Sequence, residues 1–155
     1  MANRLFLVLF VCFGAFFSCS DARIFDDVRK FDNNEWNQNN TIEFVVNVPD
    51  TLTAYDIYVH IRNDNMYEYS NLWLFIETTS PVGVSMRDTV EFILADDSGH
   101  WLGKGLGSVN SLLIPYKLNI RFPNRGIYRF NLQQAMRKET VHGMKDIGLR
   151  VQEHQ

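Results

Sequence analysis

The chain has 155 residues and a formal net charge of −3, with 15 Lys and Arg against 18 Asp and Glu. This length suits about one domain. The sequence contains no run of basic residues that could follow a phosphate backbone, so nucleic acid is not expected as a partner. Hydrophobic residues make up 46% of the chain, including 12 Phe, 6 Tyr and 3 Trp, which is sufficient for a hydrophobic core.

The chain opens with the features of a secretory leader. Arg4 precedes Leu5–Phe17, an apolar or small run of 13 residues. As a helix this run would be about 20 Å long, whereas a membrane core requires about 20 residues. A spanning helix is therefore the weaker interpretation, and a signal peptide is the stronger one.

The end of this run distinguishes between kinds of signal. Ordinary cleavage requires small residues at the −3 and −1 positions. If the cut followed Ser18, Ser18 would suit the −1 position, but Phe16 would occupy the −3 position and is too large. A bacterial lipoprotein signal, cut before a cysteine that then carries the lipid, fits better and predicts lipidation of Cys19. Cys12 lies inside the apolar run and is a poor rival, and a leader cysteine without a role is the alternative. Residues 1–18 are thus predicted to be a lipoprotein signal peptide. The protein is predicted to be anchored to the inner or outer membrane of a bacterial envelope.

Cleavage would leave 137 of the 155 residues and change the net charge from −3 to −4, because Arg4 is the leader's only charged side chain. Cys19 would then be the only cysteine, so neither an internal disulfide nor a cysteine metal site is expected. Residues 19–40 are predicted to hold the lipid anchor, a tether and a possible first strand at Ile24–Phe31. The stretch "DNNEWNQNN" (Asp32–Asn40) favours a tether.

From Thr41 the apolar residues recur with a period of two, which indicates strands. The fold predicted for residues 41–155 is all-β, a single antiparallel β-sandwich of jelly-roll type. Two strands have clear inner faces, formed by Ile42, Phe44, Val46 and Val48 and by Tyr55, Ile57, Val59 and Ile61. Further strands are expected at Asn71–Thr78, Thr89–Leu94, Tyr116–Phe122, Gly126–Asn131 and Ile147–Glu153.

Turns and one helix complete the predicted elements. "DDSG" (Asp96–Gly99) suits a tight turn ending in a residue of positive φ, and "FPNRG" (Phe122–Gly126) places Pro and Gly at turn positions. One short helix is expected at Asn131–Glu139. Asn131 would cap it, and Leu132, Ala135 and Met136 would share a face.

Familiar catalytic motifs are not found. "GHWLGKGLGS" (Gly99–Ser108) has the wrong glycine spacing for a phosphate loop and fits a bulged hairpin that lets Trp101 turn inward. His60, His100, His142 and His154 are scattered, and Ser98 and Ser108 lack the elbow of a serine hydrolase. No catalytic residue, metal site, cofactor or small-molecule substrate is predicted.

One apolar run breaks the strand alternation. "LWLFI" (Leu72–Ile76) is apolar at five consecutive positions, so Trp73 and Phe75 must point away from the core. Tyr58 interrupts the polar side of its own strand in the same way. We expect Tyr58, Trp73 and Phe75 to form an outer aromatic patch that binds a protein partner. The alternative is that the predicted helix or the first strand covers them.

Five segments carry a family likeness: "YDIYVHIRND" (Tyr55–Asp64), "YSNLWLFI" (Tyr69–Ile76), "DTVEFILADDSGHWLGKGLGS" (Asp88–Ser108), "GIYRFNLQQAMR" (Gly126–Arg137) and "GMKDIGLRV" (Gly143–Val151). Together they resemble the GldH-type gliding-motility lipoproteins of the Bacteroidetes. The resemblance implies an accessory lipoprotein of a gliding apparatus, or of the associated secretion apparatus, lipidated at Cys19. It supplies no catalytic residues.

Three functions remain open from the sequence. The first is a non-enzymatic subunit that is anchored to the membrane and docks other envelope or motility proteins. The second is a module that binds envelope glycans on Trp36, Trp73 and Trp101. A hydrolase is the weakest, since two carboxylates set apart in space cannot be identified from one sequence.

Overall fold

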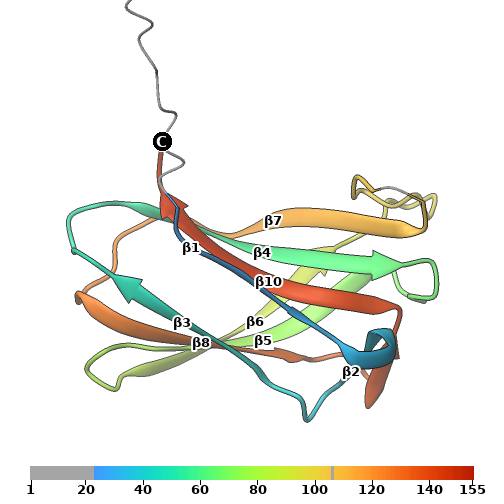
Figure 1. The fold of residues 1–155 in the computed structure, drawn as a ribbon, viewed down its shortest axis with the longest axis horizontal. Coiled ribbons are helices and arrows are strands. Elements are labelled where there is room, and N and C mark those ends of the chain that lie inside the picture. The colour runs from blue at the N-terminus through green and yellow to red at the C-terminus, as the bar shows by residue number, and fades with distance from the viewer. Residues whose placement is uncertain (1–22, 106) are drawn as a thin grey trace, which may run out of the picture.

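The computed structural model describes residues 23–105 and 107–155. Two four-stranded antiparallel sheets lie face to face (Figure 1). The first sheet has the order β1 (Arg23–Lys30), β10 (Met144–Glu153), β4 (Tyr55–Asp64) and β7 (Val109–Ile120). The second sheet has the order β3 (Ile42–Val48), β8 (Gly126–Gln134), β5 (Asn71–Thr79) and β6 (Ser85–Ile93). A two-stranded sheet joins β2 (Glu35–Asn37) to β9 (Thr140–His142).

This strand order is that of a jelly roll. When the eight long strands are counted in chain order, the two sheets read 1-8-3-6 and 2-7-4-5. The all-β antiparallel sandwich predicted from the sequence is therefore confirmed. In this topology successive long strands from β3 to β5 alternate between the sheets, so neighbours in sequence often lie on opposite layers.

The core consists of the inward-facing residues of both sheets, as the period-two pattern predicted. In β3 the buried residues are Phe44, Val46 and Val48. In β4 the four predicted inner residues, Tyr55, Ile57, Val59 and Ile61, are each at most 1% exposed.

The helix predicted at Asn131–Glu139 is wrong. Residues up to Gln134 continue β8, which pairs with β3 on one side and β5 on the other. The Gln134 side chain is 1% exposed and shapes the turn that follows. Its Nε2 donates to the carbonyls of Lys138 and Glu139, and its Oε1 accepts from the Met136 N–H. Strand pairing on both edges satisfies the backbone of this segment more completely than an isolated short helix would.

The segment Asp32–Asn40, expected to be a tether, is folded against the sandwich. Trp36 in β2 is completely buried and stacks on Phe31, with ring centroids 4.8 Å apart. Its indole N–H donates to the Asn40 carbonyl at 2.8 Å. A 3-10 turn at Asp32–Asn34 connects β1 to β2. Any tether must therefore precede Arg23, outside the described residues.

The glycine-rich segment after β6 forms a tight hairpin. Gly99 has a φ of +80°, and Asp96 Oδ1 accepts hydrogen bonds from the backbone of Ser98 and His100. A Cβ on Gly105 would lie 1.5 Å from the Val109 carbonyl oxygen, so only glycine fits there. Trp101 is partly buried against the core, the inward position that the hairpin interpretation predicted.

The two long sides of the sandwich differ. On one side β1 lies beside β3, where the Phe25 and Phe44 rings meet edge to face at 6.0 Å. On the other side Asp88 of β6 accepts an ion-pair hydrogen bond from Lys117 Nζ at 2.7 Å and another from the Tyr116 hydroxyl. The hydrogen bonds from the Lys117 ammonium and the Tyr116 hydroxyl lower the pKa of Asp88. An apolar groove of 310 Å³ opens beside this polar link, between β6 and β7.

Candidate functional site

The outer face of the second sheet carries Trp73 and Phe75. In β5, Leu72, Leu74 and Ile76 are completely buried and face the first sheet. The two aromatic residues between them point the other way, with Trp73 37% exposed and Phe75 half-buried. We call this outer surface around Trp73 and Phe75 the docking face, after the partner binding that the sequence predicts for it. The alternation breaks because both sides of β5 are apolar, as the sequence indicated.

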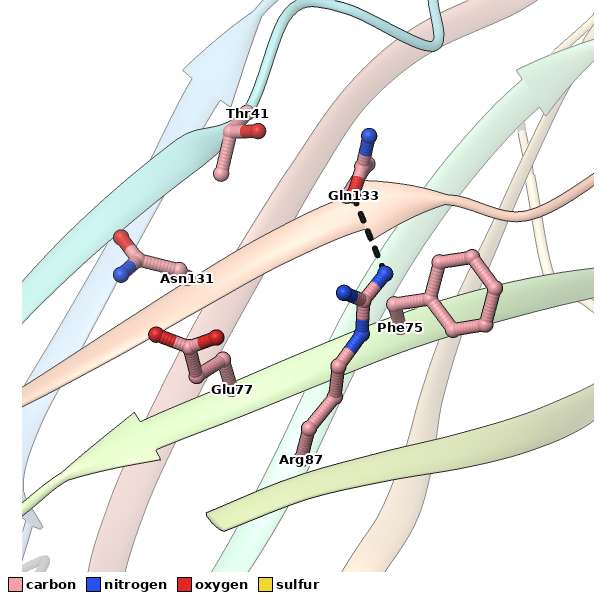
Figure 2. Close-up of a pocket in the computed structure, with 6 residues that line it drawn as sticks. All are labelled: Thr41, Phe75, Glu77, Arg87, Asn131 and Gln133. Carbon is pink, nitrogen blue, oxygen red and sulfur yellow. Dashed lines mark hydrogen bonds between the residues drawn. The ribbon is translucent and has the colours of Figure 1, made fainter. Parts of the chain in front are cut away.

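A cationic side chain packs on the docking face. The Arg87 guanidinium of β6 lies 4.1 Å from the centre of the Phe75 ring, a cation–π contact. Figure 2 shows this side chain reaching toward Gln133 of β8, whose Oε1 accepts from Nη2 at 3.4 Å. Glu77 stands directly across from Arg87 in the strand register. Arg87 thus covers part of one aromatic ring while keeping its charge near the surface.

Two shallow hollows flank the aromatic residues. One, of 180 Å³, is drawn in Figure 2 and is lined by Thr41, Phe75, Glu77, Arg87, Asn131 and Gln133. The other, of 450 Å³, is lined by Tyr69, Asn71, Trp73, Ala135, Met136 and Arg137. The Met136 side chain is held beside Trp73 in the second hollow, because its sulfur accepts a hydrogen bond from the Trp73 backbone N–H at 3.3 Å. The first hollow is lined mainly by polar side chains around Phe75, whereas the second is mixed, and each includes one arginine.

The structure does not place Tyr58 in this patch. Tyr58 belongs to β4 of the first sheet, where it pairs with Arg150 and Pro115. Its side chain is half-buried on the opposite outer face of the sandwich. Trp73 and Phe75 are therefore brought together, and Tyr58 is separated from them by the whole core. Among residues 23–105 and 107–155, neither a helix nor β1 lies over the pair, since β1 pairs with β10 in the first sheet.

The three tryptophans considered for glycan binding also lie apart. Trp36 is completely buried and cannot offer a ring face to a sugar. Trp101 lines a hollow with Tyr67 and Tyr69, and its ring centre is 6.4 Å from that of Tyr67. Tyr69 borders both this hollow and the one beside Trp73. Trp73 and Trp101 thus flank a common tyrosine, without Trp36.

One histidine contact joins two strands of the first sheet. His60 Nε2 lies 2.8 Å from Ser111 Oγ, linking β4 to β7. Burial lowers the pKa of His60 below its ordinary value of 6.5. Within residues 23–105 and 107–155, no carboxylate is hydrogen-bonded to His60, and no group of three or more His, Cys, Asp or Glu side chains could hold a metal ion.

Comparison with known proteins identifies the family. The family model described as GldH lipoprotein matches residues 23–151. The chain belongs to the GldH lipoprotein family. A protein named "Gliding motility lipoprotein GldH homolog" from Christiangramia forsetii is 35% identical over 144 residues, covering 88% of both chains. The "Gliding motility lipoprotein GldH" of Flavobacterium johnsoniae is 28% identical over 144 residues, covering 88% of this chain and 89% of its own.

A solved structure of infectious bursal disease virus, Gx strain, aligns with 86% of this chain and 30% of its own chain at 12% identity. Its TM-score of 0.34 is too low to support a conclusion.

Membership in the GldH family makes the protein a membrane-anchored lipoprotein of the cell envelope, as the leader predicted. The matched region begins at Arg23 and takes in every strand of the sandwich except the last two residues of β10. None of the helices in the described part of the chain is long and apolar enough to cross a membrane. The signal peptide and Cys19 precede the described residues, so lipidation of Cys19 stays a prediction.

Proposed function

We propose that this GldH-family lipoprotein is a non-enzymatic docking subunit of the gliding motility apparatus and the associated secretion apparatus. A lipid on Cys19 holds it at the membrane, and the docking face binds another envelope protein of the apparatus. The observation that carries the proposal is the exposure of Trp73, 37%, beside Phe75 on a strand whose Leu72, Leu74 and Ile76 are completely buried. Aromatic side chains dominate the binding energy of protein interfaces, and an aromatic patch left exposed is typical of a contact site.

The charges around the docking face indicate what kind of partner surface would fit it. Arg87 and Glu77 line one hollow and Arg137 the other, so a complementary partner presents an apolar group for Trp73 and polar groups of both charges around it. Arg87 is already desolvated on one side by Phe75, which strengthens its interaction with an incoming carboxylate. Both hollows are open to solvent, which suits contact with a protein surface better than enclosure of a small molecule.

Trp73→Ala tests this proposal in full-length protein extracted from envelopes with detergent. The variant should stay membrane-bound and folded, because a part-exposed ring contributes less than the roughly 3–5 kcal/mol of a buried one. The envelope protein that co-purifies with the wild type should be lost. Leu113→Ala is the matched control, since Leu113 is 39% exposed on the outer face of the other sheet. Equal recovery of the partner with both variants would contradict the proposal.

A glycan-binding module is the second candidate function. It is favoured by the placement of Trp73 and Trp101 on either side of Tyr69, with Asn71 and Arg137 available to bond hydroxyl groups. Retention of the wild type on a peptidoglycan or polysaccharide column, and its loss in Trp101→Ala, would support this candidate. Loss of the protein partner in Trp73→Ala without any column retention would exclude it.

A further inference from the structure

Each sheet of the sandwich ends in two edge strands, and three of the four are protected against pairing with another chain. β1 carries five charged residues among its eight and has a register shift between Arg23 and Phe25. β7 contains Pro115, two register shifts against β4 and a positive φ at Asn119. β3 lies beside β1, where the Arg29 guanidinium is 5.5 Å from the Phe44 ring centre. Charges, proline, bulges and covering elements are the devices that blunt sheet edges.

The fourth edge strand, β6, lacks a proline and a register shift. It carries three charged residues, Arg87, Asp88 and Glu91, and Asp88 bonds to Lys117 and Tyr116 of β7. Its nine residues, "SMRDTVEFI", contain no Pro, Gly or Lys. Its register against β5 is continuous from Ser85 to Ile93. Within the described residues β6 pairs with β5 alone, so the N–H and C=O groups along its other edge lack strand partners. A long regular edge of this kind is a template for another strand.

The sequence of β6 is complementary to itself when it is reversed about Thr89. In an antiparallel pair centred on Thr89, Arg87 of each copy stands opposite Glu91 of the other. Met86 then stands opposite Phe92, and Ser85 opposite Ile93. Opposite charges across an antiparallel pair are favourable, whereas like charges are unfavourable. Met86 and Ile93 are 53% and 49% exposed in the single chain, so pairing would shelter apolar surface as well.

We propose that β6 pairs edge to edge with β6 of a second copy of this chain, about a two-fold axis at Thr89. The pairing joins the two second sheets into one continuous eight-stranded sheet. Each copy contributes the same surface, as in the interfaces of most two-fold dimers. The proposal does not depend on the docking function, since the pairing uses the main-chain edge of β6 and Trp73 and Phe75 point outward from the sheet, although Arg87 borders both surfaces.

Membrane attachment is compatible with this dimer. A two-fold axis perpendicular to the joined sheets leaves both first sheets on the same side. β1 lies in the first sheet (Figure 1), and Cys19 is only four positions before Arg23. Both copies of β1, and so both anchors, then start from the same side of the joined sheet, opposite the two docking faces.

Disulfide cross-linking of the full-length protein in its membrane tests the pairing. Residues directly opposite in an antiparallel pair have Cα atoms about 4.5–5.5 Å apart, which lies inside the range for a disulfide. Thr89→Cys should form a covalent dimer under mild oxidation. Val45→Cys, on edge strand β3 and 43% exposed, should give no more dimer than the wild type. Absence of a Thr89→Cys dimer, or equal dimer at both positions, would overturn the proposal.

Charge reversal tests the register in the Thr89→Cys background. Arg87→Glu or Glu91→Arg alone should reduce the cross-linked dimer to the Val45→Cys level, because each places two pairs of like charges together. When the two single variants are produced together with different tags, the mixed dimer should form again, because both charge pairs become attractive. The doubly reversed chain, Arg87→Glu with Glu91→Arg, should also cross-link and controls for effects on folding. Failure of both the mixed and the doubly reversed forms to cross-link would refute this register.

Discussion

Trp36→Ala should strongly destabilise the protein, because the segment before the first predicted core strand is part of the folded domain. Trp36 is completely buried, and truncation of a buried tryptophan costs roughly 3–5 kcal/mol. The Phe31 ring, stacked at 4.8 Å, would lose its partner as well, which places the expected loss in the upper part of this range. The lost hydrogen bond adds little, because the Asn40 carbonyl that accepts it belongs to an exposed residue that water can reach.

Thermal unfolding followed by circular dichroism measures this loss, which corresponds to a fall in Tm of roughly 10–20 °C. Trp36→Phe separates the causes, since it keeps a stacked ring and removes only the indole donor, so it should lose about 1–2 kcal/mol. Trp73→Ala removes a part-exposed tryptophan and should lower the Tm less than Trp36→Ala does. If Trp36→Ala unfolds within about 0.5 kcal/mol of the wild type, the size of an ordinary surface substitution, residues 32–40 are not packed against the sandwich and the reasoning fails.

Three further outcomes are expected. Gly105→Ala should lower the Tm, because its Cβ would overlap the Val109 carbonyl at 1.5 Å, whereas Lys104→Ala should leave the Tm nearly unchanged; equal effects would contradict the hairpin account. Stability should fall as the pH drops below 6.5, because burial lowers the pKa of His60 and the unfolded chain binds the proton more readily; His60→Gln should reduce this fall in urea titrations at several pH values. Cys19→Ala should move the protein to the soluble envelope fraction or leave its leader uncut, and a membrane-bound, processed variant would refute lipidation at Cys19.

The strands were predictable because the period of two is a direct consequence of one buried face. The inner residues of β3 and β4 were assigned correctly from the sequence, as was the exposure of Trp73. The helix was mispredicted because "NLQQAMRKE" has helical spacing at Leu132 and Met136, while the decisive interactions are not local. They are the pairing of β8 with two strands and the side-chain hydrogen bonds of Gln134.

The docking face was only partly predictable for a topological reason. Tyr58 and Trp73 occupy equivalent outward positions on consecutive strands, which suggested neighbouring strands in one sheet. In a jelly roll the chain crosses to the other layer between β4 and β5, so the two side chains point in opposite directions. Arg87 was missed because cation–π contact with Phe75 depends on the register of β5 with β6. The sequence feature that could have predicted this register is the tight turn between β5 and β6, where Gly83 has a φ of +83°.

Site-specific photo-cross-linking in intact cells tests the docking account most directly. A photoreactive aromatic amino acid in place of Trp73 should form a covalent adduct with one envelope protein, because the docking face is predicted to be covered by that partner. The same amino acid in place of Leu113, at nearly the same exposure on the opposite outer face, should form no such adduct. A protein adduct at both positions, or at position 113 alone, would contradict the claim that the face around Trp73 and Phe75 is where this lipoprotein docks.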